Sequence, residues 1–273
     1  MKNSTLTLAL LVSVMRASSA YAEPSLTQTA DEREPFSIAT VERIRLEVKE
    51  LIAEKKYLRA QKNLAELLET PDLPEDLKRK IEDSYLKLNR KILFSKYETP
   101  DSVMHEVVSG DSLHKIAKKY KTSVGFIKRV NGLKKDVILL GSKLKIPQGD
   151  FRTSVDVSQN LLTIYFNDKP IQQYTVGTGS DETPTPIGTF KITDKLENPT
   201  WYKTGAVVPP GSPENGLGTR WLGFDKKGYG IHGTNEPDSI GKHESSGCIR
   251  MLNKNVEELY ALLPSGSEVK VVR

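Results

Sequence analysis

The sequence predicts a multi-domain protein with both α and β parts: a helical segment, a small β-α-α-β domain and a mostly-β C-terminal domain. The chain has 273 residues, more than one ordinary domain needs. Apolar residues recur at spacings of three and four before residue 98, the helical period, and at a spacing of two after residue 150, the strand period. With 37% hydrophobic and 27% charged residues, the composition is that of a globular protein.

Residues 1–22 have the pattern of an export signal. Lys2 precedes an apolar run from Leu6 to Met15, and Ala20-Tyr21-Ala22 matches a small-residue cleavage site. The run is shorter than the ~20 residues of a membrane span, so we expect cleavage and no span in the mature chain; an uncleaved anchor is the alternative. An exported protein would act in the periplasm or cell wall. Residues 23–35 are polar and aperiodic, as in a flexible linker.

The charge of the chain is mildly basic. The net charge of +5 at pH 7 is not concentrated in a Lys/Arg stripe. We therefore predict no nucleic-acid partner, whereas an anionic polymer suits this charge.

Residues 36–98 predict a hairpin bundle of three helices joined by short breaks. Pro71 and Pro74 interrupt the pattern, and Pro74 is placed as a first helical residue. The bundle spaces the later domains or binds a protein partner, and both roles stay open. The apolar stripes contain Ile38, Val41, Ile44, Val48, Leu51 and Ile52; Tyr57, Ala60, Leu64, Leu67 and Leu68; and Leu77, Ile81, Tyr85, Leu88 and Ile92.

Residues 104–148 predict a β-α-α-β unit. A short strand leads to a turn at Gly110-Asp111, and the first helix is capped by Asp111 or Ser112. The second helix ends at Asn131-Gly132, a C-cap signal, and the last strand runs from Lys143 to Ile146.

This unit resembles a LysM domain over its whole length, through S-G-D-S-L, K-I-A-K-K-Y, N-G-L and L-K-I-P. LysM domains bind N-acetylglucosamine-containing glycans such as peptidoglycan and chitin. The resemblance implies a glycan groove between Gly110–Leu113, which includes Asp111, and the loop Val137–Gly141. His114 stands where the family often has an aromatic residue.

Residues 150–273 predict a mostly antiparallel sheet, because its hairpins are too short for parallel crossovers. A helix is expected from Lys254 to Leu263. Trp201 and Tyr202 lie in a long loop between Leu196 and Gly218, where they favour a lid. The expected strands are Thr153–Val157, Leu162–Phe166, Ile171–Val176, Gly188–Thr193, Arg220–Phe224, Tyr229–His232 and Glu268–Val272.

The stretch Ile231–Leu252 carries the groups of a covalent acyl-transfer site. Cys248 is the only cysteine, so it cannot form an internal disulfide. In an exported protein, an unpaired thiol therefore indicates a functional role. His232 ends a predicted strand and can serve as its base. Gly247 lets the chain turn behind the sulfur, and Arg250 shares a face with Cys248 if the chain is extended there. A buried pair without chemistry, a zinc site with His243, and His243 as the base are the alternatives.

These residues are similar to the L,D-transpeptidase catalytic domain of the YkuD type. The resemblance rests on H-G-T at His232, S-x-G-C-I-R-M from Ser245, T-P-x-P-I-G-T-F over Thr183–Phe190 and L-G-T-R-W-L-G-F over Leu217–Phe224. It implies Cys248 as nucleophile, His232 as base oriented by a backbone carbonyl, backbone N–H groups as oxyanion hole, and no cofactor or metal. Supporting positions are Ser245, Gly247 and Arg250, and expected substrate contacts are Gly233, Trp201, Tyr202, Trp221 and Ser246.

The resemblance also implies a two-step reaction. Cys248 attacks the carbonyl of the third residue of a tetrapeptide stem and expels the terminal D-alanine, and an amine of a second stem takes the acyl group, giving a 3-3 peptidoglycan cross-link. Water as acceptor gives carboxypeptidase activity, and a protein lysine gives lipoprotein attachment. Penem-type β-lactams are expected to acylate Cys248. A non-catalytic peptidoglycan-binding protein is the alternative of another class.

Overall fold

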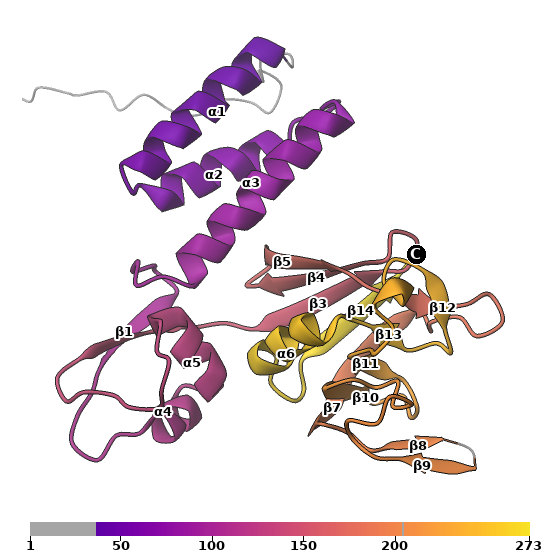
Figure 1. Ribbon diagram of the computed structural model, residues 1–273. Coiled ribbons are helices and arrows are strands. Elements are labelled where there is room, and N and C mark those ends of the chain that lie inside the picture. The colour runs from indigo at the N-terminus through magenta and orange to yellow at the C-terminus, as the bar shows by residue number, and fades with distance from the viewer. Residues whose placement is uncertain (1–36, 204) are drawn as a thin grey trace, which may run out of the picture. The chain divides into compact units, whose positions relative to one another are not determined.

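The structure is a computed structural model that describes residues 37–203 and 205–273 (Figure 1). The predicted export signal and linker lie outside the described residues. None of the helices in the described ranges is long and apolar enough to cross a membrane.

The helical segment forms three helices, as the apolar stripes predict: α1 (Ile38–Ala53), α2 (Tyr57–Leu68) and α3 (Glu75–Leu93). Pro74 is the residue before α3 instead of its first residue, a shift of one position. The stripes face one another and form a core of their own. Its buried side chains include Val41, Val48, Leu51, Ala60, Leu64, Ile81 and Leu88.

The β-α-α-β unit has the predicted order: β1 (Ser102–Glu106), α4 (Leu113–Lys119), α5 (Val124–Asn131) and β2 (Lys143–Pro147). The two strands pair antiparallel. Ser112 is the cap of α4, because its Oγ accepts a hydrogen bond from the Lys115 N–H. Asp111 instead accepts from the Val108 N–H at 2.9 Å, and its carboxylate bonds to His105 Nε2 at 3.0 Å. Gly132 ends α5 in the left-handed conformation, as a C-cap requires.

The C-terminal part is built on an eight-stranded sheet in the order β13-β11-β10-β7-β14-β3-β4-β5. Five of its seven neighbouring pairs are antiparallel; β11–β13 and β3–β14 are parallel. The mostly antiparallel prediction is therefore confirmed. The strands are β3 (Phe151–Asp156), β4 (Leu161–Phe166), β5 (Lys169–Thr175), β7 (Gly188–Glu197), β10 (Arg220–Phe224), β11 (Gly230–His232), β13 (Ile249–Arg250) and β14 (Glu268–Val272).

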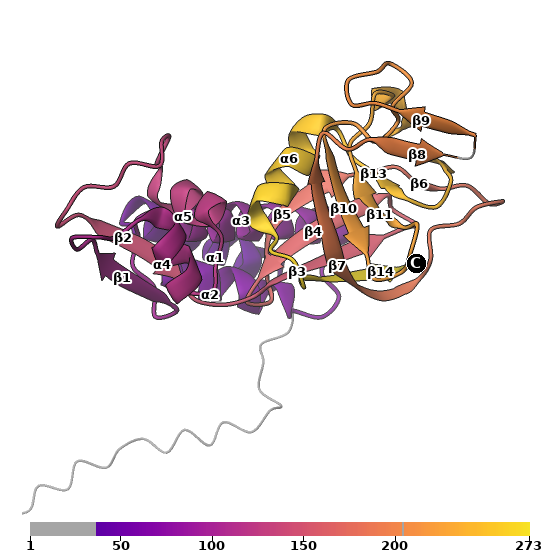
Figure 2. The same ribbon diagram turned by 90° about the horizontal axis from the view of Figure 1, so that it is seen from below.

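Smaller elements complete this part. The long loop after β7 contains an antiparallel hairpin of β8 (Trp201–Lys203) and β9 (Ala206–Val208). A second small sheet joins β6 (Thr178–Gly179) to β12 (His243–Ser245). The helix α6 (Asn253–Leu262) packs against β10 and β11 (Figure 2), and the short 3-10 helix η1 (Pro237–Ser239) precedes β12.

Polar contacts join the helical segment to the two parts that follow it. Glu258 on α6 forms ion pairs with Arg90 on α3 and with Arg129 on α5. The buried Lys145 on β2 donates from Nζ to the carbonyl oxygens of Ile92 and Ser95, at 2.7 and 3.1 Å. The helical segment therefore packs against both parts, a role that its apolar stripes alone did not indicate.

Candidate active site

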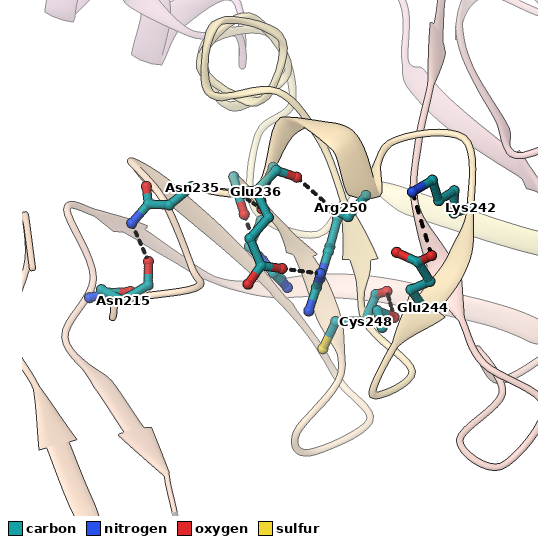
Figure 3. A network of polar contacts seen from close by, with 12 residues as sticks. Asn215, Asn235, Glu236, Lys242, Glu244, Cys248 and Arg250 are labelled. Atoms are coloured by element: carbon teal, nitrogen blue, oxygen red, sulfur yellow. Dashed lines mark hydrogen bonds and ion pairs between the residues drawn. The ribbon is translucent and has the colours of Figure 1, made fainter. Parts of the chain in front are cut away.

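The parallel pairing of β11 and β13 brings the predicted base and nucleophile together. His232 lies opposite Arg250, and Ile231 lies opposite Ile249. Because side chains alternate along a strand, the two isoleucines point into the core, where both are fully buried. His232 and Arg250 share the other face, and Cys248 directly precedes β13 on the side where the Arg250 guanidinium lies (Figure 3). His232 and Cys248, sixteen residues apart in sequence, are thus placed on or beside two neighbouring strands.

His232 is held as a neutral imidazole, and within residues 37–203 and 205–273 only one of its two ring nitrogens has a hydrogen-bond partner. Its Nδ1 donates to the Gly233 carbonyl oxygen at 2.6 Å, which leaves the lone pair on Nε2. Its ring stacks on Trp221, with centroids 5.8 Å apart, and the side chain is only 5% exposed. Burial lowers the pKa of His232 from its usual 6.5 to about 4; the Gly233 hydrogen bond opposes this shift and the Arg250 charge adds to it. The imidazole is therefore unprotonated at neutral pH.

Cys248 is half-buried, with its thiol 3.5 Å from the Gly228 carbonyl oxygen. Burial raises the pKa of this thiol above its usual 9.0, against the opposing influence of the Gly230 backbone and the Arg250 charge. At neutral pH the sulfur is therefore protonated and needs a base before it can attack. Within residues 37–203 and 205–273, the Cys248 N–H has no hydrogen-bond acceptor, so it is available to an oxyanion.

The turn before Cys248 is set by Ser245 and Gly247. The Ser245 hydroxyl donates to the Cys248 carbonyl oxygen at 2.6 Å and accepts from the Gly247 N–H at 3.1 Å. Gly247 has a φ of +99°, and a Cβ there would come within 2.8 Å of the Tyr229 ring. The position therefore accepts only glycine without strain. Thr183 adds a hydrogen bond from its hydroxyl to the Ser245 carbonyl oxygen at 3.0 Å.

Arg250 forms an ion pair with Glu236, from Nη1 to Oε2 at 2.8 Å (Figure 3). Next to Glu236, the Asn235 side chain donates to the Asn215 carbonyl oxygen at 2.8 Å. Asn215 is buried and its own amide donates to the Pro199 carbonyl oxygen at 2.9 Å. The segment after His232 thus links the guanidinium to the base of the β8–β9 hairpin.

A groove of about 310 Å³ opens beside the thiol. Trp201 and Tyr202 enter it from β8, so the predicted lid residues do line the site, although they belong to a hairpin instead of an irregular loop. Tyr202 is 77% exposed, and Ser246 is exposed but does not line this groove. The groove is lined by Leu196, Pro199, Thr200, Trp201, Tyr202, Leu217, Trp221, Gly228 and Cys248.

The remaining predicted residues lie elsewhere or act through the backbone. Gly233 contributes its carbonyl oxygen to His232. Gly110 and Asp111 belong to the turn of the β-α-α-β unit, where Asp111 bonds to His105 and the Val108 N–H.

His243 stands in a different environment from His232. Its Nδ1 is 2.7 Å from the Thr178 hydroxyl, and its Nε2 is 3.2 Å from the Asn160 side-chain nitrogen. Both ring nitrogens are occupied, which favours His232 as the base. In the part of the chain that the structure describes, no group of three or more His, Cys, Asp or Glu side chains is arranged to hold a metal ion. The described residues therefore do not support the zinc alternative.

Sequence reasoning missed Glu236, Tyr229 and Thr183. Thr183 and Glu236 stand inside motifs that were recognised, T-P-x-P-I-G-T-F and the residues after H-G-T. The contacts of these residues depend on loops that meet only in the folded protein. For Thr183 and Glu236, position within a motif was the only indication in the sequence.

A half-buried thiol, a neutral imidazole and a guanidinium lie on one edge of a mostly-β domain, and these are groups that acyl transfer to a thiol would use. The sequence matches the L,D-transpeptidase catalytic domain family (YkuD) over residues 150–271 and the LysM domain family over residues 105–147. The chain belongs to the L,D-transpeptidase family and carries a LysM domain.

Two relatives from Bacillus subtilis carry this assignment. YqjB of Bacillus subtilis, named as an L,D-transpeptidase, is 43% identical over 128 residues, which cover 45% of this chain and 72% of the relative. YkuD of the same organism is 33% identical over 175 residues, covering 62% of this chain and 98% of the relative. Among solved structures, an L,D-transpeptidase from Mycobacterium smegmatis is 20% identical with a TM-score of 0.40, over 49% of this chain and 64% of that one.

Proposed function

We propose that this protein forms 3-3 cross-links in peptidoglycan through an acyl-enzyme on Cys248. The observation that carries the proposal is the pairing of β11 with β13, which puts His232 opposite Arg250, two residues after Cys248, while His232 Nδ1 is held by the Gly233 carbonyl oxygen. Family membership supplies the class of reaction. The thiol, the base and the donor for an oxyanion all come from this chain.

In the first step, His232 Nε2 takes the proton of the Cys248 thiol as the sulfur attacks the third-residue carbonyl of a tetrapeptide stem. The Cys248 N–H donates to the oxygen that becomes negative. The carbon–nitrogen bond then breaks, and the terminal D-alanine leaves with the proton that His232 holds. A thioester on Cys248 remains.

In the second step, His232 takes a proton from the amine of a second stem as that amine attacks the thioester. The carbon–sulfur bond breaks, and the proton returns to the sulfur. Ser245 and Gly247 hold the turn that presents the sulfur, and Gly233 keeps the His232 proton on Nδ1. Trp201, Tyr202 and Trp221 give the groove apolar walls for the stem, and the exposed Ser246 is expected to contact the stem as well.

The LysM domain is proposed to hold the glycan strands of the same polymer. Four apolar side chains near the expected groove are largely exposed, which suits the apolar faces of sugar rings. Gly110 and Asp111 shape the neighbouring turn. The exposed side chains are Val108, Val137, Leu139 and Leu140, between 58% and 74% exposed.

Location and organisation follow from the same proposal. A protein with this substrate acts in the periplasm or the cell wall, in agreement with the predicted export signal. The domain limits 36–98, 104–148 and 150–273, and a protein partner for the first of these, stay predictions.

The test is incubation of the mature protein with purified tetrapeptide muropeptides and identification of the products. We expect 3-3 cross-linked dimers and free D-alanine, and neither with Cys248→Ala. Tripeptides alone would instead identify water as the acceptor. Binding to peptidoglycan sacculi without any change in the muropeptides would favour the non-catalytic binding protein.

A further inference from the structure

The Arg250–Glu236 ion pair joins a covered cation to an exposed anion. The Arg250 side chain is 22% exposed, whereas the Glu236 side chain is 69% exposed. One carboxylate oxygen contacts one guanidinium nitrogen. A guanidinium can hold a carboxylate with two parallel hydrogen bonds, so the single contact with Glu236 uses only part of the hydrogen-bonding capacity of Arg250.

The main chain of Arg250 is fixed in place. Its N–H donates to the Gly177 carbonyl oxygen at 2.8 Å, and its own carbonyl oxygen accepts from the Gly177 N–H at 2.9 Å. It lies opposite His232 in the strand register, and its charge influences the pKa of both His232 and Cys248. An anion held by this guanidinium therefore lies close to the reacting sulfur.

Glu236 is fixed in its backbone but not in its side chain. Its N–H donates to the Thr234 hydroxyl at 2.9 Å, and its carbonyl oxygen accepts from the Ser239 hydroxyl at 2.7 Å. The carboxylate can leave Arg250 by rotation of its own side chain while the main chain stays in place. Because exposed ion pairs are weak, this exchange costs little.

We propose that Glu236 is a displaceable counterion that occupies a carboxylate-binding position at Arg250, and that a carboxylate of the donor stem takes this position when substrate binds. The inference rests on the proposed function for the identity of the ligand, while the anion position itself rests on the ion pair. Glu236 is thus a positioning residue: it keeps Arg250 neutralised until an anionic substrate replaces it.

The test compares two alkylating probes of nearly equal size, iodoacetate and iodoacetamide. In both reactions the Cys248 thiolate forms a carbon–sulfur bond and iodide leaves; only iodoacetate carries a carboxylate. In Glu236→Gln, which keeps the shape of the side chain and removes its charge, the ratio of the iodoacetate rate to the iodoacetamide rate should rise about threefold at low salt. The increase should disappear near 1 M salt, where charges are screened.

Glu244→Gln is the matched control, because Glu244 is an exposed carboxylate of the same stretch whose partner is Lys242 instead of Arg250. It changes the net charge of the protein equally and should leave the ratio unchanged. Equal ratios in the wild type and Glu236→Gln, or equal increases in both variants, would overturn the inference. The iodoacetamide rate reports the state of the thiol in each protein, and the muropeptide assay fails or succeeds independently of this ratio.

Discussion

The two histidines of the stretch Ile231–Leu252 lie eleven residues apart and have opposite surroundings. His232 is buried, gives one nitrogen to a backbone carbonyl and keeps the other free. His243 is exposed and has both nitrogens occupied by Thr178 and Asn160. Thr178 donates its own proton to the Asn160 side-chain oxygen, so His243 Nδ1 donates to Thr178 and Nε2 accepts from Asn160.

Nearness in sequence to a nucleophile is therefore a poor guide to which histidine serves as its base. His243 is five residues from Cys248, but β12 pairs with β6, which commits its ring to a structural network. His232 is sixteen residues away, and β11 pairs with β13 directly after the cysteine. Strand pairing decides which imidazole is free.

Removal of each imidazole ring in turn should separate the two histidines by the largest effect. His232→Ala should slow acylation of Cys248 by meropenem by about 10² to 10⁴-fold, the usual contribution of a general base. His243→Ala should change it less than about threefold, because that ring only closes a surface network. Rates are read from intact-mass spectra over time. The reverse order of effects would assign the base to His243.

The second prediction uses the pH dependence of stability. Because burial holds the pKa of His232 at about 4 instead of 6.5, the unfolded state binds this proton first as the pH falls. The free energy of unfolding should therefore fall by about 3 kcal/mol through this group alone between pH 6.5 and pH 4. Urea unfolding at several pH values measures it.

A glutamine variant provides the control for this measurement. His232→Gln removes the titrating group, so its stability should depend less on pH than that of the wild type over this window. If the free energy of unfolding of His232→Gln depends on pH as steeply as that of the wild type, the buried imidazole is not the group responsible for the dependence.

The third and smallest effect concerns the turn that presents the thiol. Gly247 and Gly266 both have positive φ, +99° and +87°, but only at Gly247 would a Cβ meet a neighbour, the Tyr229 ring at 2.8 Å. Both alanine variants should lose about 1 kcal/mol of stability from backbone strain. Only Gly247→Ala should also slow meropenem acylation, by about tenfold, since a misplacement near 1 Å already costs rate. Equal acylation rates in the two variants would show that Gly247 does not help to position the thiol.

Much of the fold could be predicted because the apolar periods are clean. The expected strand Arg220–Phe224 and the C-cap at Gly132 occur as predicted, and β7 extends from the expected Gly188–Thr193 to Glu197 because β10 pairs along its far end. The position of His232 at a strand end also followed from the pattern I-H-G. Local rules describe such features because each depends on residues nearby in sequence.

Contacts between distant segments could not be predicted in this way. The junction of Arg90, Arg129 and Glu258 joins three helices far apart in the chain, and each residue resembles an ordinary surface charge in sequence. The same holds for Lys145, whose burial depends on the end of α3. The hairpin inside the long loop was missed because β8 and β9 have only three residues each.

The most direct test of the central claim is to trap the acyl-enzyme. The wild-type protein is mixed with a tetrapeptide stem, quenched in acid after seconds and digested, and the peptide that contains Cys248 is sequenced by mass spectrometry. We expect the mass of the tripeptide acyl group on Cys248, a much smaller acylated fraction in His232→Ala, and a wild-type fraction in His243→Ala. Release of D-alanine by the wild type without any acyl group on Cys248 would contradict the central claim.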